Sequence, residues 1–298
     1  MAMEAYYCYA VDVDGTVIDG VGDHTIDPGV NLIRPMLDGL CDPRMAAADI
    51  IDPQVLFGSP AIATLLDAIS ATDPLAGKTL GGSDKITMYL QKQANYGTRA
   101  TGSSHLKLEL SAGLLVPVDL SAGNEEAALL SCRGIIGDGG QTYTASSALA
   151  GTIAPDERYF AGPAKLNNVT LDGIQRIQVA FGLNLYIARE AGSAGPAFIG
   201  IQTRTPVVRI TTTNAALLST YYLPVAISAA THFYLRKGDL NGGRVAAATE
   251  EHIKITINAG KILAMPVSGA QQMLTLEIHP TYNGTNNILV FDTSCAIA

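Results

Sequence analysis

The chain repeats itself: residues of its first half recur in the second half in the same order and at nearly the same spacing. Internal repetition constrains the architecture more than any local propensity does. Asp172 follows Asp19 by 153 residues, Tyr234 follows Tyr89 by 145, and His252 follows His105 by 147. The matched residues are Asp19-Gly20-Val21 with Asp172-Gly173-Ile174, Gly29 with Gly182, Asn31-Leu32 with Asn184-Leu185, Pro43 with Pro196, Pro53 with Pro206, Val55 with Val208, Leu65 with Leu218, Tyr89-Leu90 with Tyr234-Leu235, Arg99 with Arg244, and His105 to Gly113 with His252 to Gly260.

The repeat predicts two copies of one domain in tandem. Chance matches between common residues would not keep their order and spacing along the chain. We therefore expect residues 1–155 and 156–298 to fold alike, because duplicated sequence normally keeps its fold. The stretch from Thr144 to Pro155 is rich in Ser, Thr, Ala and Gly and suits a short connection between domains. A chain of 298 residues is long enough for two separate cores.

The matched segments have the period of β-strands. Leu106, Leu108 and Leu110 alternate with polar residues, as their counterparts in the second copy do, which is typical of half-buried antiparallel strands. Asn283-Gly284 predicts a hairpin turn, since both residues tolerate positive φ, and Gly137 to Gly140 occupy the matching place in the first copy. Further expected strands are Val169 to Leu171, Ile174 to Ala180, Val207 to Thr213 and Leu274 to Ile278.

Helical patterns are few. One helix is predicted over Pro60 to Ile69 and a weaker one over Asn214 to Tyr221, one in each copy. The expected fold is therefore mainly β: two tandem β-sandwich or barrel domains, each with a flanking α-helix.

Composition favours assembly and argues against nucleic-acid recognition. Charged residues make up 15% of the chain, below the roughly 25% of ordinary soluble domains, and a large uncharged surface favours association. The net charge of −8 and the lack of a basic run do not suit phosphate binding. The first residues do not form a secretory signal, and the charge-free run from Ile210 to Leu235 carries Pro224 and many hydroxyl residues. We expect a soluble chain made in the cytoplasm, with no membrane partner.

The cysteines give no sign of a metal site. Cys8, Cys41, Cys132 and Cys295 have neither C-x-x-C spacing nor any other ligand rhythm. Free thiols in a reducing compartment are the simplest interpretation. No cofactor is expected.

One motif suggests chemistry. Asp12-Val13-Asp14-Gly15-Thr16 resembles the first motif of haloacid-dehalogenase-type phosphatases, in which the first aspartate attacks phosphorus and the second is an acid/base. That family alternates strands and helices, and this chain does not. The repeat also places Lys165 and Asn167 opposite the two aspartates. We interpret the motif as a strand followed by an Asp-Gly turn and keep the phosphatase as an alternative.

The other polar residues form no catalytic group. His105 and His252 begin equivalent strands with no nucleophile or acidic cluster beside them in sequence, so a structural role is predicted. The pairs Glu125-Glu126 and Glu250-Glu251 lie in polar loops, where solvated side chains are expected. Gly81-Gly82 and Gly242-Gly243 are not followed by a helix and imply no phosphate cradle. No catalytic, cofactor-binding or metal residue is therefore predicted.

Three stretches resemble the major tail tube proteins of long-tailed, non-contractile phages. They are Asp42-Pro43 through Ile51-Asp-Pro53-Gln-Val-Leu-Phe57 to Ala63-Thr-Leu-Leu66, Tyr159 to Pro163 leading into Leu171 to Gly182, and Arg204-Thr-Pro206 through Thr213.

The resemblance implies a structural virion protein and not an enzyme. In that family six β-domains with flanking helices form a ring around a continuous inner barrel, and rings stack into a tube that conducts DNA. Two domains per chain would make each ring a homotrimer, located in the virion tail, with other tail proteins as partners. We expect an acidic lumen through which DNA passes without binding. The alternatives are another virion β-protein, such as a capsid decoration, tail completion or adaptor protein, or an enzyme.

Overall fold

The described part of the chain is mainly antiparallel β-structure, with 57% of its residues in strands and 8% helical, which confirms the mainly-β class. The structure is a computed structural model that describes residues 6–18, 20–22, 24–33, 47–92, 105–137, 139–145, 157–239, 242–265 and 273–297. The expected connection is seen only at its start, because β12 (Gln141–Ala145) includes Thr144 and residues 146–156 lie outside that description. The boundary at residue 155 therefore stays a prediction.

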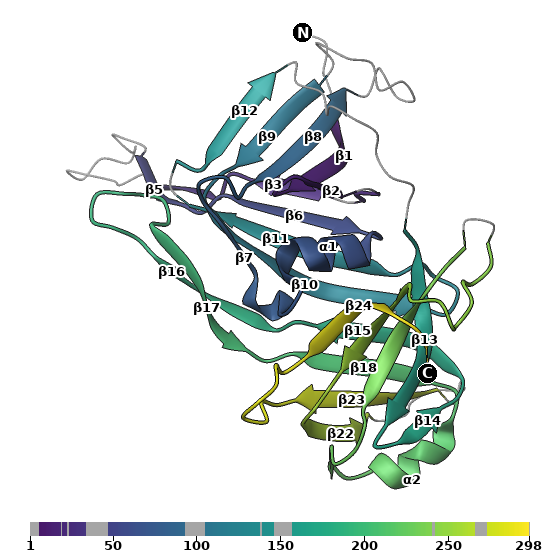
Figure 1. The fold of residues 1–298 in the computed structure, drawn as a ribbon. Helices are drawn as coiled ribbons and strands as arrows, with labels where there is room; N and C mark the ends of the chain where they lie inside the picture. The colour runs from purple at the N-terminus through teal and green to yellow at the C-terminus, as the bar shows by residue number, and fades with distance from the viewer. Residues whose placement is uncertain are drawn as a thin grey trace, which may run out of the picture.

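Each half of the chain contributes a similar series of elements (Figure 1). The first half contains β1 (Tyr6–Val13), β2 (Thr16–Ile18), β3 (His24–Asp27), β4 (Val30–Ile33), β5 (Ala47–Ile51), β6 (Gln54–Ser59), α1 (Ile62–Ser70), a 3₁₀ turn (Pro74–Ala76), β7 (Lys78–Leu80), β8 (Ile86–Lys92), β9 (His105–Leu110), β10 (Gly113–Gly123), β11 (Leu129–Ile136) and β12. The second half contains β13 (Tyr159–Leu166), β14 (Val169–Leu171), β15 (Ile174–Ala180), β16 (Leu183–Ala188), β17 (Phe198–Arg204), β18 (Val207–Thr212), a 3₁₀ turn (Ala215–Leu217), α2 (Leu218–Tyr221), β19 (Val225–Ala226), β20 (His232–Lys237), β21 (His252–Thr256), β22 (Gly260–Ala264), β23 (Leu274–Pro280) and β24 (Val290–Cys295).

The strand order is the same in the two halves. The order β12-β9-β8-β1-β2 of one small sheet matches β24-β21-β20-β13-β14 of the other. In the large sheet, β10-β11-β6-β3 matches β22-β23-β18-β15. The register matches too: Leu56 of β6 lies opposite Arg133 of β11, and their counterparts Arg209 and Glu277 lie opposite each other. The sequence repeat therefore corresponds to a repeated arrangement of strands.

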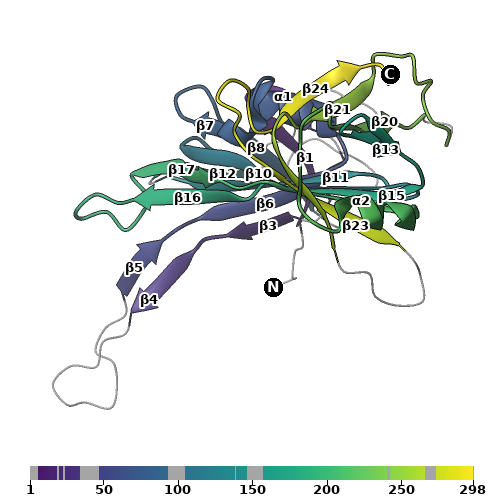
Figure 2. The ribbon, with the colours of Figure 1, turned by 90° about the horizontal axis from the view of Figure 1, so that it is seen from below.

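The two halves share one large sheet, because β10 of the first half pairs with β15 of the second. The small sheets and α1 cover one face of this large sheet, and the other face is open (Figure 2). Side chains alternate accordingly, so that Val55 and Phe57 of β6 are buried under the cover while Leu56 between them is exposed. One apolar core runs through both halves.

Two long hairpins extend from the large sheet. β4–β5 continues β3 and β6, and β16–β17 continues β15 and β18 (Figure 2). Gly29 and Gly182 stand where each hairpin leaves the sheet, with φ of 58° and 57°. A Cβ on either glycine would come closer than 3.0 Å to a backbone oxygen of the strand opposite. Only glycine fits these positions without strain, which explains why the repeat keeps them.

Most predicted elements are present, and one turn prediction is wrong. The strands predicted at 169–171, 174–180, 207–213 and 274–278 are β14, β15, β18 and β23, to within two residues at their ends. The first predicted helix is α1, and the second begins as a 3₁₀ turn capped by the Asn214 side chain, which accepts from the Ala216 N–H at 3.2 Å.

The expected hairpin at Asn283-Gly284 is not formed. β23 and β24 belong to different sheets, and so do β11 and β12 on either side of Gly137–Gly140. The side chain of Asn283 instead accepts from the N–H groups of Thr285 and Asn286, which closes a local turn within a crossover between layers. Turn chemistry predicted a reversal correctly, but not which strands it joins.

Candidate assembly interface

The aspartate motif forms a tight turn between β1 and β2. Asp14 and Gly15 have φ of 53° and 82°, and Asn167 and Asn168 occupy the same place in the second half with 48° and 66°. Positive φ at both central residues defines the type I′ turn that joins two-residue hairpins. The side chain of Asp12 accepts the Gly15 N–H at 2.7 Å. The prediction that Asp-Gly serves as turn chemistry is confirmed.

Asp14 is held by a lysine. Its carboxylate lies 2.8 Å from the Nζ of Lys78, and this hydrogen bond is the main reason why the pKa of Asp14 is below its usual value. Asp84 also lies within 3.8 Å of the same ammonium. Among the described residues, no group of three His, Cys, Asp or Glu side chains is arranged to hold a metal ion.

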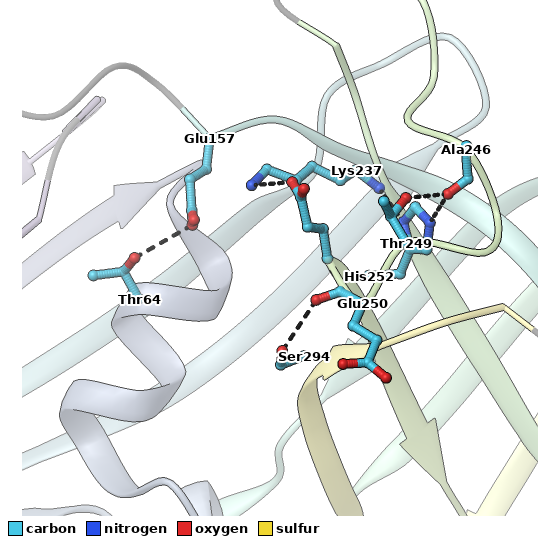
Figure 3. A network of polar contacts seen from close by, with 9 residues as sticks. Thr64, Glu157, Lys237, Ala246, Thr249, Glu250, His252 and Ser294 are labelled. Atoms are coloured by element: carbon cyan, nitrogen blue, oxygen red, sulfur yellow. Dashed lines mark hydrogen bonds and ion pairs between the residues drawn. The ribbon is translucent and has the colours of Figure 1, made fainter.

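The two equivalent histidines are built into the fold. His252 is buried, its Nδ1 accepts the backbone N–H of Lys237 at 3.1 Å, and its Nε2–H donates to the carbonyl of Ala246 at 2.9 Å (Figure 3). His105 is also buried, and its ring lies edge-on to Tyr9. Both nitrogens of His252 are occupied by backbone groups, which is the structural role that was predicted.

The remaining candidates are the acidic pairs and the cysteines. Glu125 and Glu126 are exposed, and of the other acidic pair Glu251 makes an exposed ion pair with Lys237 at 3.0 Å. Cys8 and Cys132 are buried free thiols, and Cys295 is half-buried; burial raises the pKa of Cys8 to about 12 and that of Cys295 to about 11. Cys41 lies outside the described residues. Cys295 lies opposite His252, the neighbour of Glu251, and its thiol donates to the His252 carbonyl at 3.2 Å, which is a contact with the backbone.

What the structure does build is a junction between the halves. β10 and β15 pair in register from Asp119 opposite Ala180 to Gly123 opposite Arg176. Backbone hydrogen bonds continue the junction at both ends, from the N–H of Phe181 to the carbonyl of Val118 at 3.1 Å and from Asn124 to Gln175 at 2.8 Å. Alternate residues on the covered side of these strands, such as Leu120 and Val179, are fully buried.

The β16–β17 hairpin strengthens this junction by reaching across to the first half. Its Arg189 forms an ion pair with Asp52, and the carbonyl of Ala194 accepts the N–H of Ile51 at 3.0 Å. At the base of the hairpin, Arg204 pairs with Asp73 at 2.8 Å. The second half therefore engages the first through a shared sheet and a hairpin laid beside it.

The counterparts of the junction strands lie at or next to the ends of the large sheet, β3 at one end and β22 beside β19 at the other. β3 corresponds to β15, yet among the described residues it pairs only with β6. Along one edge, β10 pairs first with β7 and then with β15. Its counterpart β22 pairs with β19 at the position where β10 pairs with β7. The residues that follow β22, 266–272, lie outside the description. A sheet end with unused backbone donors and acceptors is a template for another strand.

The open face of the large sheet carries paired charges. Glu277 lies 2.7 Å from Nε of Arg209 and 2.8 Å from His279, and the pKa of Asp119, raised mainly by burial, is lowered in part by the nearby Arg176 and Arg209. Arg133 donates to Gln54, whose amide donates to Asp27. The ionised side chains of the described strands on this face are the carboxylates Asp27, Asp119 and Glu277 and the cations Arg133, Arg176, Arg209 and Lys261.

Carboxylates and cations therefore stand together on the described strands of this face. No observation identifies the surface that would line a lumen, so the acidic lumen stays a prediction.

Sequence reasoning missed the junction as a site. The repeat aligned the strand after Asp19-Gly20-Val21 with the strand after Asp172-Gly173-Ile174. It did not show that β15 pairs on both sides, whereas β3 pairs with β6 alone among the described residues.

No known protein family matches the chain, and no curated protein matches it either. No helix among the described residues has the length and apolar character needed to span a bilayer. The geometry alone therefore supports the functional argument.

Proposed function

We propose that the chain is the structural subunit of a phage tail tube, in which three copies close a ring and rings stack into a conduit for DNA. The observation that carries this proposal is the junction of β10 with β15. Pairing β3 of one chain, which has no second partner strand among the described residues, with the β22 side of the next would reproduce the internal junction between chains. Repetition of one contact in a head-to-tail manner generates a ring when the rotation closes.

The strand arithmetic fits such a ring. Each chain supplies β22-β23-β18-β15-β10-β11-β6-β3, which is eight strands, so three chains supply a barrel of 24 strands. Barrel diameter grows with the number of strands, and barrels of roughly 16–18 strands already enclose an aqueous channel. Closure would also remove both sheet ends, which otherwise invite uncontrolled association.

In this ring the open face of the large sheet lines the channel, because the small sheets and α1 occupy the other face (Figure 2). Cations on that face stand beside carboxylates, as Arg209 stands beside Glu277. Phosphates bind where lysines and arginines can release counterions. A cation that is already paired with a carboxylate binds phosphate less tightly, so charge pairing on this face favours DNA passage, as the expected acidic lumen would.

The test begins with the purified full-length chain, viewed by electron microscopy and weighed by native mass spectrometry. Rings of three chains with an open channel, stacked or single, are the expected result. A chain that stays monomeric, or that binds preformed capsids without forming rings, would overturn the proposal.

Proline variants locate the contact. Successive N–H groups of a strand point to opposite sides, so one of Thr25→Pro and Ile26→Pro removes an outward donor of β3 without touching its pairing with β6. That variant should remain folded by circular dichroism and lose rings. The matched controls are Thr16→Pro and Val17→Pro in β2, which ends a small sheet; the variant of that pair that stays folded should keep rings.

A further inference from the structure

The junction between the halves has an outer layer besides the shared sheet. α1 of the first half lies against β24 of the second half (Figure 1). The hydroxyl of Thr293 in β24 donates to the Asp67 carboxylate of α1 at 2.9 Å, and the Asn287 amide donates to the carbonyl of Thr72 at 3.2 Å. Beside them, Thr64 of α1 donates to Glu157 at the start of the second half (Figure 3).

The counterparts of these two elements are far apart in one chain. β12 corresponds to β24, and α2 corresponds to α1; Figure 1 shows β12 and α2 at opposite ends of the molecule. The register identifies the residues involved. Tyr143 of β12 pairs with Leu108, and Phe291 of β24 pairs with Ile255, the counterpart of Leu108.

Exposure differs sharply between the two equivalent aromatic residues. Phe291 is 7% exposed and stacks on Phe181 of its own half with ring centroids 6.1 Å apart, whereas Tyr143 is 53% exposed. At the other end of the chain, Tyr222 and Leu223, which follow α2 directly, are 75% and 69% exposed. Exposed large apolar side chains that lie together mark interaction surfaces.

Both surfaces also lack charge. β12 has the sequence Gln-Thr-Tyr-Thr-Ala, and no ionisable Asp, Glu, Lys or Arg occurs between Ile210 and Leu235, the run that contains α2. Apolar groups flanked by hydroxyl and amide side chains can be buried against each other without burying an unpaired charge.

We propose that the end of α2 in one chain, with Tyr222 and Leu223, docks on β12 of the next chain at Tyr143, forming an outer seam that repeats the α1–β24 contact. This inference rests on the proposed ring, since the occupant is a second copy of this chain. The seam lies on the covered side of the large sheet, outside the barrel. It would add apolar burial to the strand pairing between β3 and the β22 side.

Disulfide trapping tests the seam directly. In a Cys41→Ser, Cys295→Ser background, which leaves the two buried thiols Cys8 and Cys132, the double variant Tyr143→Cys with Leu223→Cys is oxidised after assembly. Head-to-tail contact should give covalent dimers and closed trimers on non-reducing gels, and each single variant should give monomers. The matched control is Leu129→Cys with Leu223→Cys, because Leu129 is exposed on the open face and should not be trapped.

The outcomes separate this seam from the ring itself. Rings that form normally but trap no disulfide at positions 143 and 223 would overturn the seam and leave the tube proposal standing. Trapping of Tyr143→Cys alone would mean that β12 meets β12, which also overturns it. If the parent chain forms no rings at all, the proposed function fails and the seam with it.

Substitution gives an independent measurement. Tyr143→Ser should raise the protein concentration needed for half-maximal ring formation about tenfold or more, whereas Tyr143→Phe should leave it within about twofold, because the contact is apolar. Equal behaviour of the two variants would contradict the seam. The thermal unfolding of the isolated chain should be unchanged in both, since Tyr143 is exposed there.

Discussion

Replacing Gly113 by alanine should destabilise the chain more than any exposed glycine substitution. Gly113 begins β10 with φ of 133°, and a Cβ there would come closer than 3.0 Å to the carbonyl oxygen of Ile135 on β11. Its counterpart Gly260 has φ of 143° and the same close approach to His279. The position couples an unfavourable dihedral angle to a backbone clash at the start of a strand that joins the two halves.

The cost can be estimated from the two effects. A residue forced into a glycine-only backbone region costs about 1–3 kcal/mol, and overpacking against the backbone costs about 1–3 kcal/mol more. We expect a loss of about 3 kcal/mol for Gly113→Ala. For domains of about 150–250 residues, 1 kcal/mol lowers Tm by about 2–4 °C, so the expected decrease is about 6–12 °C.

Two further glycines serve as matched controls for thermal and urea unfolding. Gly81 has an ordinary φ and open space around its Cβ position, so Gly81→Ala should stay within about 0.5 kcal/mol of the parent. Gly82 has φ of 63° but also open space, so Gly82→Ala reports the dihedral cost alone, about 1–2 kcal/mol. If Gly113→Ala costs no more than Gly82→Ala, the close approach to Ile135 contributes nothing and the reasoning is refuted.

Three other predictions address the motif, a half-buried charge and the thiols. Asp12→Asn and Asp14→Asn should leave the urea midpoint and assembly nearly unchanged, since Asn167 already occupies the turn position equivalent to Asp14. Mg²⁺-dependent phosphate release from the parent, abolished by Asp12→Asn, would restore the phosphatase. Burial raises the folded-state pKa of Asp119, so the stability that its protonated form contributes is present at low pH and is lost as pH rises through that pKa. Urea titrations should show the parent losing stability relative to Asp119→Asn as pH rises above about 4. A loss of the parent's relative stability on acidification would contradict this. Cys8, with a pKa raised to about 12, should resist a thiol reagent at pH 8 until the chain is unfolded, and rapid labelling of the native chain at Cys8 would show that β1 opens.

Local patterns in the sequence correctly predicted many of the strands and the first helix. The alternation of His105–Leu110 and His252–Thr256 is that of β9 and β21, and the apolar spacing of Ile62, Leu65, Leu66 and Ile69 is that of α1. These features depend on residues close in sequence, whose period directly reflects burial on one side.

Pairing between distant strands was beyond such patterns. Asn283-Gly284 looks like a hairpin turn, yet the chain there crosses from the large sheet to a small one, because β23 is already paired with β18 and β22. The fusion of the halves through β10 and β15 was likewise unforeseen. A prediction of two domains says nothing about whether their sheets end or join, since edge pairing depends on backbone groups that every residue carries.

The residues kept between the halves are those that shape the backbone. Gly29 with Gly182 and Gly113 with Gly260 share their positive φ and their close approach to an opposite strand. On the open face the same register carries different chemistry: Leu56 opposite Arg133 in the first half becomes Arg209 opposite Glu277 in the second.

A binding site used by both halves would have kept its side chains, whereas a shared scaffold needs only its glycines, turns and core. A ring built from three such chains would therefore have nearly six-fold symmetry in its backbone and only three-fold symmetry in the charges of its channel. Cryo-electron microscopy distinguishes the two: maps averaged with six-fold symmetry should retain strand density but blur the side chains at Leu56 and Arg209. Clear side-chain density under six-fold averaging would mean that the halves do not alternate around the ring.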